Sequence, residues 1–230
     1  AFGVSENNFL GRGIEFASDL SVSSSTVKAL ISINNPNYKG SNRSLNTSIE
    51  STTTDNLANY GYKSNKIGFS IGSGFEFYDD LRWNTGVSSY VERLETDTSA
   101  SATMKKQEGS YFDTYLNQAF IYDKRNQRYK TTNGIRSVFA QEIPLISDDY
   151  SLANSYEITK WFQFDNEMIT DVSFYGKTIN SLNDKDVRPS SRLGLSANKM
   201  RGFETNKLGP VDGTDYIGGN YAAAINFSTT

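Results

Sequence analysis

The sequence contains no cysteine and no histidine among its 230 residues. Without cysteine there is neither a disulfide framework nor a thiolate metal site. Without histidine the chain lacks the commonest general base, the Ser-His-Asp arrangement and the imidazole ligands of metal centres. These absences argue against most classes of enzyme. We therefore expect no catalytic residue, no metal site and no cofactor.

The sequence also has a small net charge, few prolines and no long apolar runs. The net charge is −3 and there is no basic run, so nucleic acid is not an expected partner. No stretch approaches the roughly 18 apolar residues of a transmembrane helix. A membrane protein remains possible, because a transmembrane β-strand presents only every second side chain to lipid and has a low mean hydropathy.

Aromatic residues are abundant, at 13% of the chain, and apolar residues alternate with polar ones. In the segment 67–77, Ile67, Phe69 and Ile71 fall on one parity, and Gly68 and Ser70 fall on the other. Such alternation predicts a strand with one apolar face. About ten segments show this pattern. They lie near 9–20, 26–34, 43–53, 65–78, 81–94, 112–123, 130–143, 149–162, 166–177 and 218–229.

Two all-β architectures produce this pattern: a soluble sandwich with a dry core, and a transmembrane barrel whose apolar face meets lipid. Many segments are as long as the roughly 9–11 residues that a tilted strand needs to cross a bilayer. Strands in soluble sandwiches are usually shorter. Length, the polar opposite face and the Tyr and Phe content favour the barrel.

The connections between the predicted strands differ in length. The turns at 77–81 and 145–150 are short and contain paired aspartates, which we interpret as solvated turn positions. The connections 95–111 and 178–217 are long, and the first could hold a short helix or two short strands. Lys105–Lys106 and Arg188–Pro189 are interpreted as solvated loop positions.

Four short motifs resemble the BamA family of bacterial outer-membrane assembly factors, within the bacterial surface antigen superfamily. "NNFLGRGIEF" at 7–16 is similar to the Asn-Phe-Leu-Gly-x-Gly that opens the family's barrel, and "NNPNY" at 34–38 to a turn after the second strand. "MRGFETNKLGP" at 200–210 resembles the Val-Arg-Gly-Phe loop, and "IGGN" at 217–220 the start of the following strand. The order of all four agrees with the family, and the resemblance covers essentially the whole chain.

The resemblance implies a fold and a role for the long loop. The expected fold is an all-β, antiparallel transmembrane β-barrel that is partial, with about 10–12 of roughly 16 strands. The long loop near 178–217 would fold inward, with Arg201 as a buried guanidinium on an acidic wall, Gly202 allowing a tight backbone and Phe203 packing inside. The strand after the loop would begin at Gly218, Gly219 and Asn220. Asn226 stands where the family often has Glu, so that strand supplies no acidic partner for Arg201.

The resemblance also implies how much of the barrel this chain forms. Residues 1–230 would be one domain, the N-terminal and middle part of the barrel. The periplasmic domains and closing strands of the family would lie outside this chain. A partial barrel in lipid would leave unpaired strand edges, which are costly, so we expect a piece of a larger protein.

The function implied by the resemblance is non-enzymatic: the folding and insertion of β-barrel clients through a lateral seam at the first strand. Expected partners are unfolded barrel clients, assembly-complex lipoproteins and outer-membrane lipid, and the expected location is the bacterial outer membrane. A client strand would add to the exposed edge by β-augmentation. The predicted seam strand, from Phe9 to Leu20, includes Phe9, Leu10, Gly11, Gly13, Ile14 and Phe16.

Several alternatives remain open at this point. Gly11 and Gly13 could weaken the seam strand, or they could mark a barrel bend with no gating role. A related translocation or autotransporter-assembly barrel would show the same motifs. A passive porin-like channel could use the loop 178–217 as a constriction. A soluble all-β binding module would instead pack its aromatic residues into a dry core.

Overall fold

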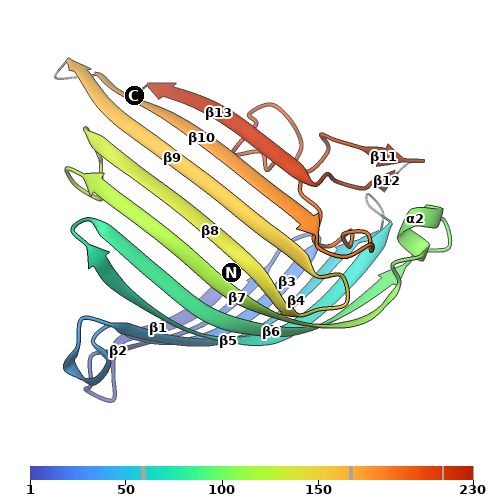
Figure 1. Cartoon of the computed structure of the whole chain (residues 1–230), viewed down its shortest axis with the longest axis horizontal. Coiled ribbons are helices and arrows are strands. Elements are labelled where there is room, and N and C mark those ends of the chain that lie inside the picture. Colours follow the sequence, from blue (N-terminus) through green and yellow to red (C-terminus); the bar gives the residue numbers. More distant parts are fainter. Residues whose placement is uncertain (58–60, 166–167, 214, 230) are drawn as a thin grey trace.

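The computed structural model describes residues 1–57, 61–165, 168–213 and 215–229. Eleven strands form one antiparallel sheet in the order β1 to β10 followed by β13 (Figure 1). The strands are β1 Phe2–Phe9, β2 Ile14–Val22, β3 Thr26–Asn35, β4 Ser44–Asn56, β5 Tyr62–Tyr78, β6 Leu81–Thr96, β7 Gly109–Arg125, β8 Gly134–Ile146, β9 Ser151–Asp165, β10 Met168–Ser181 and β13 Tyr221–Thr229.

The sheet curves continuously and does not fold into two packed layers (Figure 1). Each strand pairs with the next strand along the chain, and β13 pairs with β10 across the long loop. Within the described residues β1 and β13 are the two edges, and the sheet does not close. The predicted all-β, antiparallel, partial barrel is therefore confirmed, and the two-layer sandwich is not the fold.

The two faces of the sheet differ in polarity, as the alternation predicts. On the convex face Ile71 pairs in register with Val87, which in turn pairs with Leu116. One residue away, on the concave face, the Ser48 and Ser70 hydroxyls lie 2.8 Å apart, and Asn117 donates a hydrogen bond to Ser88. Ile71 is 47% exposed, so the apolar face is uncovered in this chain. An uncovered apolar face beside a hydrogen-bonded polar face is the arrangement of a barrel in lipid.

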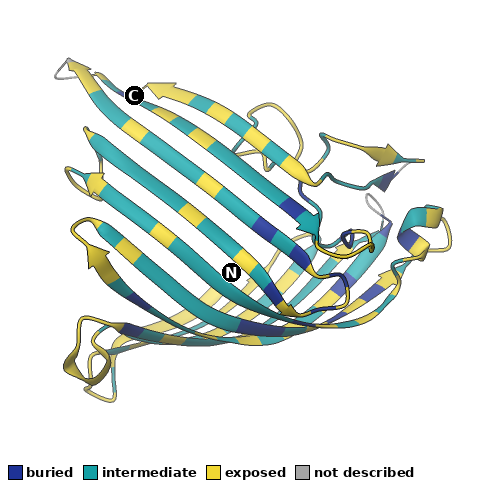
Figure 2. Cartoon of the chain, viewed as in Figure 1, coloured by how far each residue is buried: buried dark blue, intermediate teal, exposed yellow. Residues whose placement is uncertain are grey.

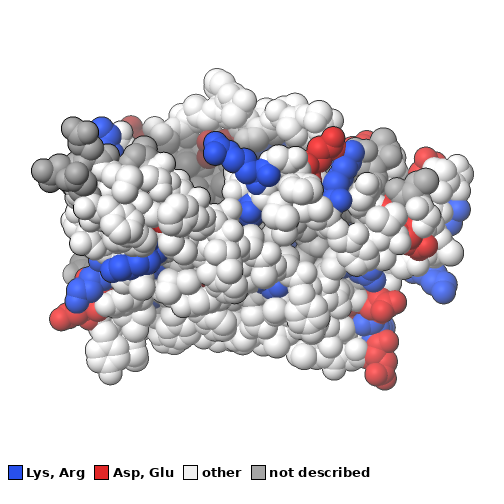
Figure 3. Space-filling model, turned by 90° about the horizontal axis from the view of Figure 1, so that it is seen from above, with Lys and Arg blue, Asp and Glu red and all other residues white. Residues whose placement is uncertain are grey.

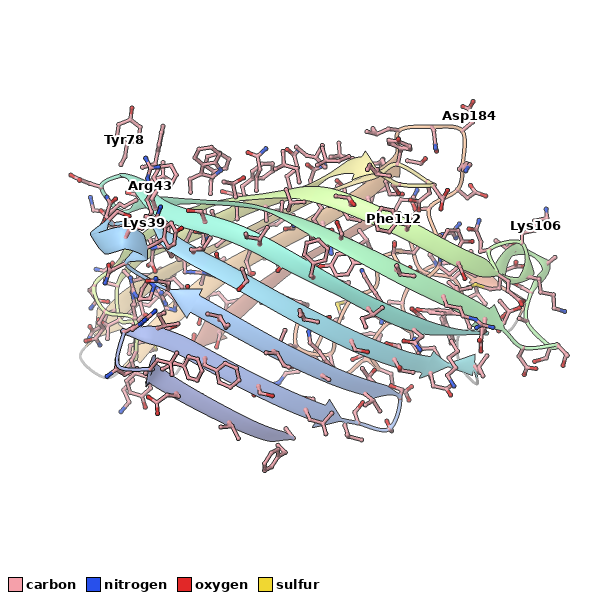
Figure 4. The ribbon with its side chains drawn as sticks, turned by 90° about the horizontal axis from the view of Figure 1, so that it is seen from below. Lys39, Arg43, Tyr78, Lys106, Phe112 and Asp184 are labelled. Atoms are coloured by element: carbon pink, nitrogen blue, oxygen red, sulfur yellow. The ribbon has the colours of Figure 1, made fainter. Side chains whose placement is uncertain are left out.

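The connections divide between the two ends of the sheet. One end, here called the turn end, carries the connections 10–13, 36–43, 79–80 and 126–133, including the 3-10 helix η1 at Tyr38–Gly40. The opposite end, here called the loop end, carries 97–108 and 182–220. In Figure 4 Lys39, Arg43 and Tyr78 lie at the turn end, and Lys106 and Asp184 lie at the loop end. In Figure 3 many charged side chains lie toward the two ends, a further group of basic side chains lies near the upper centre, and most of the remaining surface is uncharged.

The loop end contains the remaining elements. The connection 97–108 contains the short helix α2 at Ala102–Lys105. Of the two structures considered for this connection, a short helix or two short strands, the helix is therefore the correct one. The long loop contains a two-stranded ribbon of β11 Val211–Asp212 and β12 Asp215–Tyr216. In the part of the chain that the structure describes, no helix has the length and apolar character needed to span a membrane.

One predicted strand is wrong. The segment 9–20 contains a hairpin turn, because β1 ends at Phe9 and β2 begins at Ile14. Leu10, Gly11 and Gly13 have φ of 57°, 68° and 65°, a left-handed conformation that glycine adopts without strain. The Asn8 side chain accepts a hydrogen bond of 2.7 Å from the Gly13 N–H and so fixes the turn. The two glycines form a turn, and the predicted seam residues fall on both sides of it.

Candidate functional site

The long loop between β10 and β13 turns back onto the concave face of the sheet. Val187 and Leu193 of the loop are buried against Ala153 on β9 and Ile179 on β10, and Ala222 packs beside them. This small apolar cluster places the first half of the loop against the wall near the loop end, where several buried segments of β8 to β10 lie in Figure 2. The predicted inward-folded loop is therefore confirmed.

The loop is closed at its base by backbone hydrogen bonds. The Leu193 N–H donates to the Gly219 carbonyl at 2.8 Å, and the Gly219 N–H donates back at 2.9 Å. The Asn220 carbonyl accepts from the Ile179 N–H at 2.8 Å. Gly218 has φ of 67°, and a Cβ there would lie 3.1 Å from the Arg192 Cβ. Gly218, Gly219 and Asn220 thus lead into β13, which begins one residue later, at Tyr221.

A single arginine, Arg188, anchors the loop to the wall. Its side chain is 1% exposed and forms ion pairs with three carboxylates from three different elements. Nη1 lies 3.1 Å from Glu92 on β6, and Nε lies 3.2 Å from Asp149 in the turn between β8 and β9. Nη2 donates to Asp113 on β7 and also to Asp149 at 3.3 Å. We call these four residues the anchor cluster.

Neighbouring side chains hold the carboxylates of the anchor cluster in place. The Ser147 hydroxyl is within hydrogen-bond distance of both Asp113, at 2.6 Å, and Asp149, at 2.8 Å. The Ser64 hydroxyl donates to Glu92 at 2.6 Å. The Tyr111 ring lies 4.4 Å from the guanidinium carbon of Arg188, a cation–π contact. The site is therefore built on strands and one short turn, and only the arginine comes from the loop.

The electrostatics of the anchor cluster favour keeping Arg188 in place. Three buried carboxylates surround one guanidinium, so the cluster contains more negative than positive charge. Burial alone would raise the pKa of Asp149, but the hydrogen bonds and charge of Arg188 hold that pKa below its ordinary value. Without Arg188 the wall would bury three carboxylates with no cation between them, which is costly.

The structure places the sequence-predicted loop tip elsewhere. Arg201, Gly202 and Phe203 are exposed, and Arg201 makes no ion pair with any residue that the structure describes. The buried guanidinium of this loop is Arg188, so the interpretation of Arg188–Pro189 as solvated positions is wrong. Asp149, interpreted as a solvated turn residue, is 3% exposed. The solvated interpretation is confirmed for Lys105 and Lys106, which are exposed.

A weak signal for the anchor cluster is present in the sequence. Glu92 and Asp113 fall on the polar parity of their strands, among tyrosine, serine, asparagine and glycine, where a buried carboxylate requires a cation. Arg188 lies between Val187 and Pro189 in an otherwise polar stretch, residues 183–192. No sequence separation between these residues indicates that they meet.

A second cation contacts the wall close to the loop tip. Lys199 forms an ion pair with Glu157 on β9, and its ammonium lies 4.7 Å from the centre of the Tyr175 ring on β10. Both partners belong to the concave face. Lys199 therefore holds the segment that leads into Met200 and Arg201 beside β9 and β10, although Arg201 itself remains exposed.

The far part of the loop packs on the connection between β6 and β7. The Asp215 carboxylate accepts a hydrogen bond of 2.9 Å from the Ser101 N–H, at the start of α2. Met104 of α2 is fully buried. In Figure 1 the β11–β12 ribbon lies close to α2, at the loop end. The long loop is thus attached at the wall, at its base and at a neighbouring loop.

Comparison with known proteins identifies the family. The description "Omp85 superfamily domain" matches residues 8–229, which is almost the whole chain. The chain belongs to the Omp85 superfamily. No curated protein matches the sequence at a significant level.

A solved structure shares the fold of this Omp85 domain. The crystal structure of BamA from Haemophilus ducreyi lacking POTRA domains 1–3 matches it with a TM-score of 0.85 and 18% sequence identity. The match covers 98% of this chain and 48% of the BamA chain. The chain thus spans about half the length of that relative, and at this identity the likeness establishes the fold alone.

Proposed function

We propose that this Omp85 domain takes part in folding β-barrel proteins and inserting them into the bacterial outer membrane. The observation that carries the proposal is the ion-paired loop anchor inside a barrel wall that matches the Omp85 superfamily over residues 8–229. The proposed clients are unfolded outer-membrane barrels. Lipoproteins of an assembly complex and outer-membrane lipid are the other proposed partners. The domain is proposed to be the N-terminal and middle part of a larger barrel.

The proposed mechanism needs no catalytic side chain. A client strand would pair with an open strand edge, where main-chain hydrogen bonds provide affinity and side-chain alternation sets the register. The edge strand β1 is a candidate for this seam. It is short, at 8 residues, and its pairing with β2 is irregular between Glu6 and Phe9. The other edge of β1 has no partner strand among the described residues and is the edge to which a client strand would add.

The loop anchor has a structural role in this proposal. It ties β6, β7 and the β8–β9 turn to the loop that precedes β13, so one arginine links distant parts of the wall. These contacts would preserve the curvature of the wall when the seam at β1 opens. Arg201, exposed beside β9 and β10, is proposed to meet an acidic partner outside the described residues.

A passive porin-like channel is the main competing function, because a loop held on the concave face could equally restrict a pore. A related translocation or autotransporter-assembly barrel is the second. The three functions predict different results in one assay series. An assembly factor accelerates client folding. A porin-like channel conducts ions without accelerating folding, and a translocation or autotransporter-assembly barrel moves a dedicated passenger.

The decisive experiment uses the full-length protein in liposomes. Folding of an unfolded client barrel is followed by gel mobility without heating, beside Arg188→Ala and the control Arg128→Ala, an exposed arginine in the connection between β7 and β8. Acceleration by the unaltered protein and by Arg128→Ala, with at least a tenfold loss in Arg188→Ala, would support the proposal, since losing a buried ion pair costs several kcal/mol. Ion conduction in a planar bilayer without accelerated client folding would overturn it.

A further inference from the structure

A polar chamber lies between the anchored loop and the concave wall. Its volume is about 400 Å³, and its lining includes Lys66 on β5, Lys177 on β10 and Arg192 on the loop. Among the described residues, Glu142 on β8 is the only carboxylate in the lining. None of the four residues of the anchor cluster lines the chamber, although Lys66 of the lining pairs in register with Glu92. Cations therefore outnumber carboxylates in the lining itself.

The cations of the chamber form no ion pair within 4 Å with a described carboxylate. Lys66 lies 4.0 Å from the centre of the Tyr90 ring, and its in-register neighbour on β6 is Glu92 of the anchor cluster. Lys177 pairs in register with Ser155 and Ala222, neither of which is charged. Arg192 donates from Nε to the Val187 carbonyl at 3.1 Å, and its two terminal nitrogens make no hydrogen bond with a described residue.

One buried hydroxyl in the lining is also without a partner. The side-chain oxygen of Ser190 is buried and has no hydrogen-bond partner among the described residues. The Ser151 hydroxyl, also in the lining, lies beside the Asp149 carboxylate of the anchor cluster. A buried hydroxyl without a partner is costly, and a bound water or ion is one way in which such a group is satisfied.

We propose that this chamber binds an oxyanion, a carboxylate or a phosphate group, between Lys177, Lys66 and Arg192. The guanidinium of Arg192 offers the paired donors that suit both carboxylate and phosphate. The negative charge of Glu142 opposes anion binding, but three cationic side chains line the same chamber. The alternative that these cations only balance the negative anchor cluster predicts no saturable anion binding.

The anchored loop supplies part of the chamber lining. Anion binding therefore depends on the position of the loop. Ser190 and Arg192 follow Arg188 closely in sequence and are held in place by its ion pairs. If the loop leaves the wall, these two groups leave the chamber. Bound anion therefore stabilises the anchored loop, and by linkage the anchored loop strengthens anion binding to the same extent.

Equilibrium dialysis of radiolabelled inorganic phosphate against the full-length protein in detergent micelles tests the proposal. We expect saturable binding that is weakened about tenfold or more in Lys177→Gln and in Arg192→Gln, because each loses a charge-assisted hydrogen bond. Lys160→Gln is the matched control: Lys160 is an exposed lysine on the convex face of β9, and its replacement should leave the affinity unchanged. Gel mobility without heating confirms that each variant is folded.

Two further arms identify the ligand class and test the linkage. Competition by acetate as effective as by unlabelled phosphate would assign a carboxylate-type site, and competition by phosphate alone a phosphate site. Arg188→Ala should weaken phosphate binding as much as Arg192→Gln does, because the loop no longer supplies Arg192. Binding that does not saturate, or that is equal in Lys177→Gln and the unaltered protein, would overturn the proposal.

Discussion

Arg188 has the most demanding environment of any residue in the described part of the chain. It is almost fully buried and meets three carboxylates, none of which forms an ion pair with another described residue. Its planar guanidinium serves three partners because its donors point in different directions. A lysine would keep the charge but would have only one nitrogen to share among the same carboxylates.

Replacing Arg188 should release the loop. We expect Arg188→Ala to cost about 3–5 kcal/mol of loop attachment, the usual cost of breaking a buried ion pair on one side, with Arg188→Lys intermediate. Trypsin cleavage after Arg192, a half-buried loop residue, measures the release. Cleavage should rise strongly in Arg188→Ala and stay unchanged in Arg12→Ala. Equal protection of Arg192 in all these proteins would show that the loop does not depend on this anchor.

The anchor should respond to acid only at low pH. The pKa of Asp149 is held below its ordinary value of about 3.9, so its contribution to stability is fully present above that value. The contribution is lost as the pH falls through the depressed pKa, when the carboxylate is protonated. Because the chain has no native cysteine, a spin label on Asn198→Cys can report loop mobility. We expect constant mobility from pH 8 to 5 and an increase below about pH 4. A transition between pH 7 and 5 would contradict this assignment.

At the scale of elements, the strands and the long loop follow different rules. The strands form where alternation is strict, and their register repeats from β2 to β13 with few irregularities. The loop is held by individual contacts: the anchor cluster, the Lys199 ion pair and the bridge between Leu193 and Gly219. Loss of one such contact affects the loop more than loss of one strand contact affects the sheet.

The base of the loop offers a matched pair of glycine substitutions. Gly218→Val would force a β-branched residue into a left-handed conformation, at a cost of about 1–2 kcal/mol, and bring its Cβ to 3.1 Å from Arg192 and Leu193. At Gly219 the nearest atom to an added Cβ is 3.5 Å away, so Gly219→Ala should be tolerated. We expect only Gly218→Val to lower the temperature at which the unheated gel mobility is lost. A similar decrease in both variants would point to a different constraint at this site.

The whole molecule is a curved wall with an apolar convex face and a polar concave face. The convex face has no protein cover in the described chain, and Ile67, Phe69 and Ile71 of β5 are each about half exposed. Lipid is the medium in which this distribution is stable, because every second side chain can contact acyl chains while the polar side remains hydrated.

Neighbouring residues on β5 test which face meets lipid. Ile71→Lys places a charge on the convex face, and insertion should become less favourable by about 2–4 kcal/mol if this position lies near the bilayer midplane. Ser70→Lys places the same charge on the concave face and should insert almost normally. Refolding yield of the full-length protein into liposomes measures the difference. Equal yields would mean that the convex face does not contact lipid.

The sequence by itself determined the strands and their faces, because alternation is local and each strand carries its own pattern. It also indicated the inward loop and the return at Gly218–Gly219, through the resemblance. It misplaced the first strand, since the apolar residues Phe9 and Leu10 continue the alternation into a turn that Asn8 and two glycines define. For the strands and for the first turn alike, the conformation is determined by a few neighbouring residues.

Only the tertiary structure decided which arginine is the anchor. Both Arg188 and Arg201 lie in the same polar loop, and the motif around Arg201 is the more conspicuous. The choice depends on where Glu92, Asp113 and Asp149 meet, and these carboxylates converge only when β6, β7 and the β8–β9 turn become neighbours in the curved sheet. A buried charge is stabilised by the partners that surround it, and the order of residues in the sequence does not show which residues those partners are.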